Sequence, residues 1–144
     1  MVVLGGCVAL SPSPVSVQGA RPGDPSKVAR IAIDPARPVL VRGVDDVLLP
    51  GVHVSNHLRP LTYLLPAGTH VLWLSEVPYG IPFLPQHINC FVMLVDLAAG
   101  ADYELRLDSR MELPVLARPG AESAEATGRF VDRPFLPERG CQWR

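Results

Sequence analysis

The chain has 144 residues and a hydrophobic fraction of 48%, which is enough for one domain with a core and excludes wholesale disorder. Its 13 basic and 14 acidic residues give a net charge of −1, so the electrostatics provide no reason to expect nucleic acid or an anionic membrane surface as a partner. The 16 prolines and 12 glycines exclude long helices, and no apolar run reaches the roughly 18–20 residues that span a bilayer.

The N-terminal segment Leu4-Gly5-Gly6-Cys7 resembles the lipobox of bacterial lipoproteins. In that family small residues let the signal peptidase approach the backbone, and the thiol accepts a diacylglycerol. The resemblance implies that Cys7 is the lipidation site and the first residue of the mature protein. Only six residues precede Cys7 and none is basic, so a working signal peptide requires a start upstream of Met1. The alternative is a short apolar strand with a free cysteine.

Residues 11–26 contain four prolines and two glycines, a composition typical of an extended, solvated chain. Residues 1–27 are therefore predicted to be a lipobox-like start followed by a Pro/Ser-rich tether. The alternative is an ordinary disordered N-terminal arm. Val8 follows Cys7, and by analogy with enteric lipoproteins this residue favours an outer-membrane destination facing the periplasm.

Short segments with strand character begin at Val28. Alternation over residues 28–33 places Ala29, Ile31 and Ile33 on one face and Arg30 on the other. Further strands are predicted at residues 39–42, 44–49, 61–65, 69–77, 88–97 and 103–108. Together they predict an all-β domain over residues 28–118, a small β-sandwich or compact barrel of about six to eight strands with little helix.

Residues 88–97 form the most apolar run in the chain and predict a central strand. Residues 103–108 alternate, with Tyr103, Leu105 and Leu107 inward. Because the short segment 98–102 contains Gly100, the two strands are predicted to form a hairpin.

Residues 119–144, which follow the domain, have a different composition and are predicted to be an irregular C-terminal tail. Residues 119–128 are small and polar and are predicted to stay loose. Residues 129–144 combine prolines with Phe130, Phe135, Leu136 and Trp143, which indicates an irregular C-terminal tail packed across a sheet edge. A docking peptide for a partner is the alternative.

Pro66, Gly68 and His70, followed by Pro78-Tyr79-Gly80, resemble the repeating phrase of PEGA-type envelope domains. The resemblance covers residues 39–107. It implies a small PEGA-like or transthyretin-like β-sandwich that binds or spaces rather than catalyses.

Few residues of the chain are candidates for catalysis or metal binding. The chain contains no glycine-rich nucleotide motif, nucleophile elbow or zinc-protease motif. His87 and Cys90 have metal-ligand spacing, but a buried inert thiol is the favoured interpretation. His53 and His57 would need a helix to bring both rings together, and Asp45-Asp46 indicates a solvated turn. We therefore expect no catalytic residue, no metal site and no cofactor.

Two functions remain open. The first is a non-enzymatic cell-envelope lipoprotein, an accessory or partner-binding module that contacts an envelope protein or a cell-wall component and the membrane through its lipid. The second is a soluble small-ligand-binding or enzymatic β domain with a site near residues 78–87. There Tyr79, Phe83, Gln86 and His87 would suit an apolar pocket with polar groups.

The other two cysteines, Cys90 and Cys141, form an even pair if Cys7 is acylated. In an oxidising compartment they would close a loop of about 50 residues and hold down the tail. The alternative is a buried free Cys90 and an exposed free Cys141.

Overall fold

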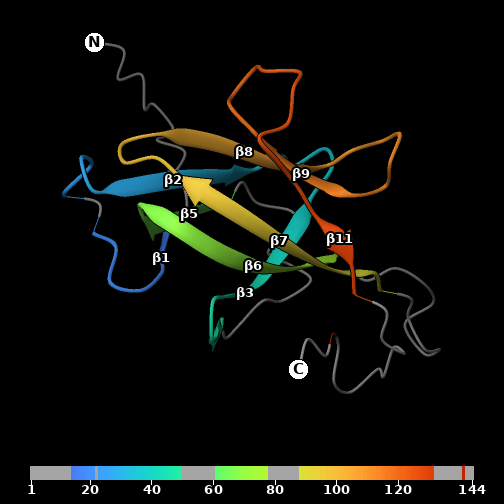
Figure 1. Cartoon of the computed structure of the whole chain (residues 1–144), viewed down its shortest axis with the longest axis horizontal. Helices are drawn as coiled ribbons and strands as arrows, with labels where there is room; N and C mark the ends of the chain where they lie inside the picture. The colour runs from blue at the N-terminus through green and yellow to red at the C-terminus, as the bar shows by residue number, and fades with distance from the viewer. Residues whose placement is uncertain (1–13, 22, 50–60, 78–87, 132–140, 142–144) are drawn as a thin grey trace, which may run out of the picture.

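The computed structural model describes residues 14–21, 23–49, 61–77, 88–131 and 141, and all regular structure within them is β (Figure 1). The strands are β1 (Val15–Ser16), β2 (Val28–Ile33), β3 (Val39–Val44), β4 (Val47–Leu48), β5 (Thr62–Pro66), β6 (Gly68–Glu76), β7 (Cys90–Leu97), β8 (Asp102–Leu107), β9 (Pro114–Ala117), β10 (Ala126–Thr127) and β11 (Arg129–Phe130).

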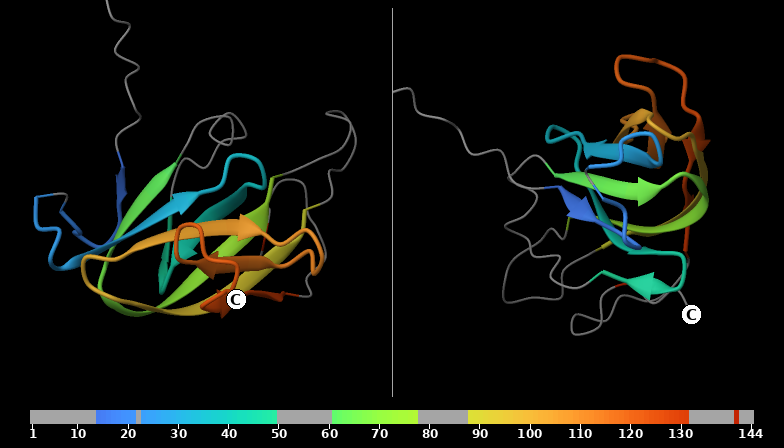
Figure 2. Two further views of the ribbon diagram at one scale, coloured as in Figure 1. Left: turned by 90° about the horizontal axis from the view of Figure 1, so that it is seen from above. Right: turned by 90° about the vertical axis from the view of Figure 1, so that its left-hand side faces the viewer.

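The strands form two sheets that pack face to face (Figures 1 and 2). The six-stranded sheet has the order β1-β5-β2-β8-β9-β10, and the five-stranded sheet has the order β11-β7-β6-β3-β4. The prediction of a small all-β sandwich is confirmed. Seven of the strands have four residues or more, and the two-residue strands β1, β10, β11 and β4 form the four sheet edges.

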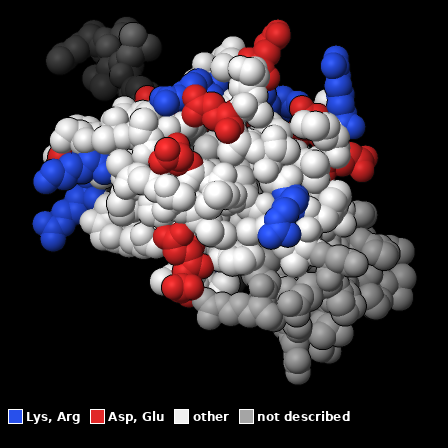
Figure 3. Space-filling model, viewed as in Figure 1, with Lys and Arg blue, Asp and Glu red and all other residues white. Residues whose placement is uncertain are grey.

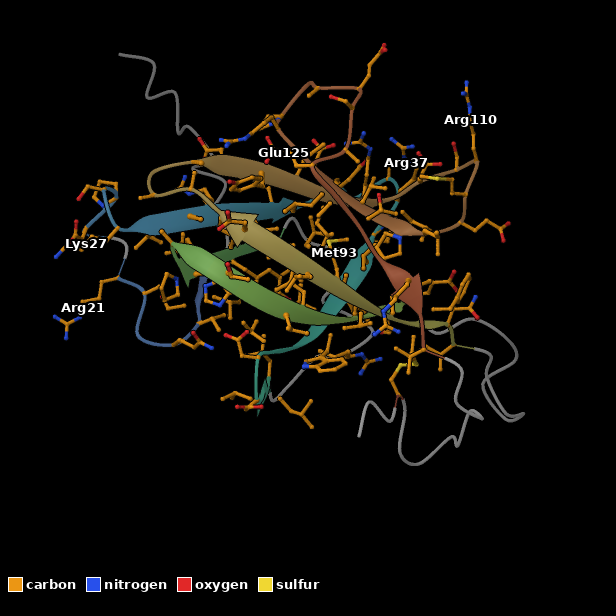
Figure 4. All side chains as sticks on the ribbon, in the orientation of Figure 1. Arg21, Lys27, Arg37, Met93, Arg110 and Glu125 are labelled. Atoms are coloured by element: carbon orange, nitrogen blue, oxygen red, sulfur yellow. A yellow bond between two sulfur atoms is a disulfide. The ribbon has the colours of Figure 1, made fainter. Side chains whose placement is uncertain are left out.

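The core lies between the sheets and follows the alternation of each strand. Ala29, Ile31 and Ile33 of β2 are buried while Arg30 is exposed, as the pattern predicts. From the facing sheet, β6 and β7 contribute Leu72 and Met93, which are fully buried; Met93 lies near the centre of Figure 4. Burial of these apolar faces is the main force that holds the two layers together.

The predicted hairpin between residues 88–97 and 103–108 is wrong. Strand β7 pairs with β6 and β11 in one sheet, whereas β8 pairs with β2 and β9 in the other. The segment between them crosses from sheet to sheet, and there Gly100 has a φ of +72° and donates its N–H to the carbonyl of Val28. The crossing lets the apolar faces of β7 and β8 pack against each other across the core.

The region around Gly43 also differs from expectation. Strand β3 runs through Gly43, and the chain reverses at Asp45 before returning as β4. A Cβ atom at Gly43 would lie 2.9 Å from the carbonyl oxygen of Val47 and 3.3 Å from Cδ1 of Trp73. Glycine therefore lets β4 and an indole ring approach the strand closely.

The sandwich extends beyond residues 28–118 on both sides. Strand β1 pairs in parallel with β5, and Val17 is only 2% exposed, so part of the segment expected to be a tether packs into the fold. Within residues 119–131, β10 pairs with β9 and β11 pairs with β7. Residues 126–127, which were expected to be loose, thus form an edge strand of the six-stranded sheet. Residues 129–130, at the start of the expected tail, form an edge strand of the five-stranded sheet.

Candidate functional site

Several residues singled out in the sequence lie outside the described residues. They are Cys7, His53, His57, Tyr79, Phe83, Gln86, His87, Phe135, Leu136 and Trp143. The predicted lipidation site and the predicted pocket of residues 78–87 therefore stay predictions.

The structure joins Cys90 and Cys141 in a disulfide, with Cα atoms 5.7 Å apart and a sequence separation of 51. Cys90 begins β7 and is only 6% exposed. Next to it, Val131 donates its N–H to the carbonyl of Cys90, and the Phe130 ring packs on Phe91 with centroids 5.0 Å apart. A disulfide sulfur is neither a nucleophilic thiolate nor a metal ligand, so this bond excludes both roles for Cys90.

A cluster centred on Asp45 is the most connected polar group among the described residues. Its carboxylate accepts hydrogen bonds from the main-chain N–H of Val71 at 2.8 Å and from Nε2 of Gln18 at 2.7 Å. Nδ1 of His70 lies 2.8 Å from the same carboxylate. The carbonyl of Asp45 accepts a further hydrogen bond from Nε1 of Trp73 at 2.7 Å.

The backbone turn at residues 45–46 explains how Asp45 reaches these partners. Asp45 has a φ of +53°, a left-handed conformation that aspartate tolerates better than most residues. Its N–H also donates to the carbonyl of Val71 at 2.8 Å, which fixes the turn beside β6. The sequence predicted this turn but not its partners, which lie 25 to 28 positions away along the chain.

His70 is only 7% exposed, and both of its ring nitrogens face oxygen atoms. Nδ1 faces Asp45, and Nε2 lies 2.7 Å from the carbonyl oxygen of Pro66. The imidazolium form donates to both oxygens at once, whereas a neutral ring donates to only one. His70, the last residue of the predicted PEGA-like phrase, thus connects the β5–β6 crossing to the turn at Asp45.

An aspartate–histidine pair is also part of hydrolytic triads, in which the second ring nitrogen activates a hydroxyl or thiol. In this cluster a main-chain carbonyl occupies that position, and a carbonyl has no proton to give up. The arrangement can fasten the N-terminal segment, the turn after β3 and strand β6 to one another. It does not provide an activated nucleophile.

The surroundings of the Asp45 carboxyl change its pKa. Partial burial by itself raises its pKa, but the hydrogen bonds from its three donors outweigh that effect, and the pKa lies below its ordinary value. The carboxylate therefore stays ionised at neutral pH and keeps its acceptor role.

Within the described part of the chain, no group of three histidine, cysteine, aspartate or glutamate side chains is placed to hold a metal ion. No helix long and apolar enough to cross a membrane occurs in that part either.

The comparisons with known proteins give no relative. No protein-family model, no curated protein and no solved structure matches this chain.

Proposed function

We propose that this protein is an exported, non-enzymatic module of the bacterial cell envelope that is anchored by a lipid on Cys7 and binds an envelope protein or a cell-wall component. The observation that carries the proposal is the disulfide between Cys90 and Cys141. Disulfides form and persist in oxidising compartments such as the periplasm and are rare in the bacterial cytosol. An exported chain whose N-terminus resembles a lipobox is most simply a lipoprotein.

The way the N-terminal segment joins the fold supports this anchoring. Residues 8–14 separate Cys7 from β1, and seven extended residues reach at most about 25 Å. Beyond them, β1 pairs with β5, and Gln18 is hydrogen-bonded to Asp45. A lipid on Cys7 would therefore hold the sandwich close to the membrane surface, and a pull on the N-terminus would be transmitted to both sheets.

The contacts of the Asp45 cluster support a structural role rather than a catalytic one. The second nitrogen of His70 faces the Pro66 carbonyl, and Cys90 is held in a disulfide. In the part of the chain that the structure describes, the imidazole of His70 and the sulfur of Cys90 are thus engaged in holding the fold.

The test is membrane fractionation of the protein expressed with its upstream reading frame. The wild-type protein is expected in the membrane fraction and to incorporate labelled palmitate, whereas Cys7→Ser is expected to be soluble and unlabelled. Ser11→Ala, four positions further on, is the matched control and should behave as wild type. Membrane association that is the same in Cys7→Ser and wild type would refute the anchor.

A further inference from the structure

A solvent-open cavity of about 500 Å³ lies at one end of the six-stranded sheet, where three connections meet. Its floor is the outer face of β8, with Glu104 and Arg106. Its walls are Arg37 from the β2–β3 connection, residues 108–110 after β8, and residues 120–122 after β9. Figure 4 shows Arg37 and Arg110 on the connections at this end, and Figure 3 shows charged side chains gathered along the same upper edge.

Main-chain hydrogen bonds fix these walls. The N–H of Leu107 donates to the carbonyl of Arg37 at 3.1 Å, which holds the β2–β3 connection beside the end of β8. The Asp108 carboxylate accepts from the N–H groups of Arg110 and Met111 at 2.8 and 2.9 Å. These two bonds lower the pKa of Asp108, with a smaller contribution from the charges of Arg110 and Arg37. The cavity is therefore preformed in the free protein.

Arg106 is the residue that marks the cavity as a binding site. Its side chain is only 12% exposed, yet its one hydrogen bond within the described residues runs from Nη1 to Oε1 of Glu104 at 3.2 Å. A guanidinium carries five N–H donors. Removing such donors from water without partners is costly, so a ligand oxyanion beside them would gain strong, charge-assisted hydrogen bonds.

The other lining groups indicate what else the ligand carries. Arg37 and Arg110 provide two more guanidinium groups on the rim, and Ser109 provides a hydroxyl. Glu122 and Asp108 provide carboxylate acceptors that suit hydroxyl groups of a ligand. A purely inorganic anion would use only the arginines, whereas a hydroxylated anion would use both sets.

We infer that this cavity binds a saccharide that carries a carboxylate or a phosphate, with the oxyanion on Arg106 and Arg110 and the hydroxyl groups on the carboxylates of the rim. The volume lies within the usual range of small-molecule sites. The site does not depend on the lipid anchor, and it would add an anionic glycan to the partners of the proposed binding module.

The test is a titration of the full-length, disulfide-bonded protein followed by two-dimensional amide nuclear magnetic resonance. Galacturonate and glucose 6-phosphate represent the two oxyanions, glucose is the neutral control, and inorganic phosphate is the ion without a sugar. Each is added to about 10 mM, which detects millimolar dissociation constants. The amide signals of Ser109, Arg110 and Ala121 are expected to move saturably with at least one sugar anion and not with glucose.

Variants connect the binding to the cavity. Arg106→Gln should weaken binding at least about tenfold, the loss expected for one charge-assisted hydrogen bond. Arg30→Gln is the matched control, because Arg30 lies on neighbouring β2, pairs with Asp102 and does not line this cavity. If Arg106→Gln fails to fold, Arg110→Gln on the exposed turn replaces it and should weaken binding several-fold.

Each outcome decides the inference. Saturable shifts with galacturonate alone assign a uronic acid, and shifts with glucose 6-phosphate alone assign a sugar phosphate. No saturable shift with either sugar anion overturns the proposal. The proposal is also overturned if inorganic phosphate binds as tightly as glucose 6-phosphate while galacturonate does not bind. An equal effect of Arg106→Gln and Arg30→Gln on the dissociation constant overturns it as well.

Discussion

At the scale of single residues, Asp45 joins parts of the chain that are far apart in sequence. Its carboxylate receives Gln18 from the N-terminal segment together with His70 and Val71 from β6. A carboxylate that loses its charge can no longer accept all of these hydrogen bonds, and a donor left without a partner in a half-buried site destabilises the fold. The contribution of this residue is therefore larger than its place in an exposed turn suggests.

We expect Asp45→Asn to lower the free energy of unfolding by about 1–3 kcal/mol, the range for loss of hydrogen bonds to a charged acceptor. Asparagine has the same shape and tolerates the left-handed backbone, but it removes the charge and replaces one acceptor oxygen by an NH2 donor. Urea unfolding measures the effect. Asp96→Asn, at an exposed position of β7, is the control and should cost less. Equal losses in the two variants would contradict the role assigned to Asp45.

The pH dependence of stability follows from the lowered pKa of Asp45. In the folded state the carboxyl binds a proton less readily than in the unfolded chain, so its stabilisation is fully present above about pH 5 and is lost as the pH falls through the folded pKa. The difference in unfolding free energy between wild type and Asp45→Asn should shrink as the pH falls below about pH 4, where the folded carboxyl takes up its proton. A difference that stays constant down to about pH 2 would argue against the charge.

The sequence located some of these residues but not their contacts. The phrase that contains Gly68 and His70 predicted a turn, and Gly68 has a φ of +124°. Composition placed Asp45 in a turn as well. Neither pattern shows that the two meet, because residues 25 positions apart are brought together only by the packing of whole strands.

At the scale of elements, the connections determine how the strands are shared between the sheets. Two of the connections that cross from one sheet to the other lie at Gly68 and Gly100, and both glycines have positive φ. The sequence could not distinguish such a crossing from a hairpin. A strand with alternating apolar residues buries one face both in a hairpin and after a crossing between sheets. Which strand it pairs with depends on which apolar faces meet across the core.

Gly128 lies at another crossing, between β10 of one sheet and β11 of the other. Its N–H donates to the carbonyl of Pro114 at 2.7 Å, and a Cβ atom there would lie 2.5 Å from Cγ of the Pro114 ring. Because a proline ring has little room to move, Gly128→Ala should destabilise the protein by about 1–3 kcal/mol.

Thermal unfolding checks this prediction, and Gly23→Ala is its control. A Cβ atom at Gly23 meets nothing within 4 Å, so this variant should unfold at nearly the wild-type temperature. If Gly128→Ala unfolds at the same temperature as Gly23→Ala, the close approach to Pro114 does not constrain the crossing.

At the scale of the whole molecule, short strands form the edges of both sheets of the sandwich. Within the described residues each sheet ends on both sides in a two-residue strand, which pairs with only two positions of the longer strand beside it, as β11 pairs with Phe91 and Val92 of β7. Regular alternation and frequent turns predicted the sandwich. The short edge strands were not predicted, because two residues carry no periodic signal and their pairing depends on a sheet that must already exist.

The disulfide between Cys90 and Cys141 is expected to be the largest single contribution to stability outside the core. It closes a loop of 51 residues, and restriction of the unfolded chain by such a loop is worth about 4 kcal/mol in the chain-entropy model. Reduction of the wild-type protein should therefore lower the free energy of unfolding by about 2–4 kcal/mol, as measured by urea unfolding with and without a thiol reductant.

Cys141→Ser should show the same loss in both conditions, because it has no bond left to reduce. Cys7→Ser is the matched control and should keep the wild-type response to reductant, since Cys7 takes no part in the bond. If reductant leaves the wild-type stability unchanged, the bond does not hold the C-terminal segment to the sheet, and the pairing of β11 with β7 and the contact between Phe130 and Phe91 must hold it alone.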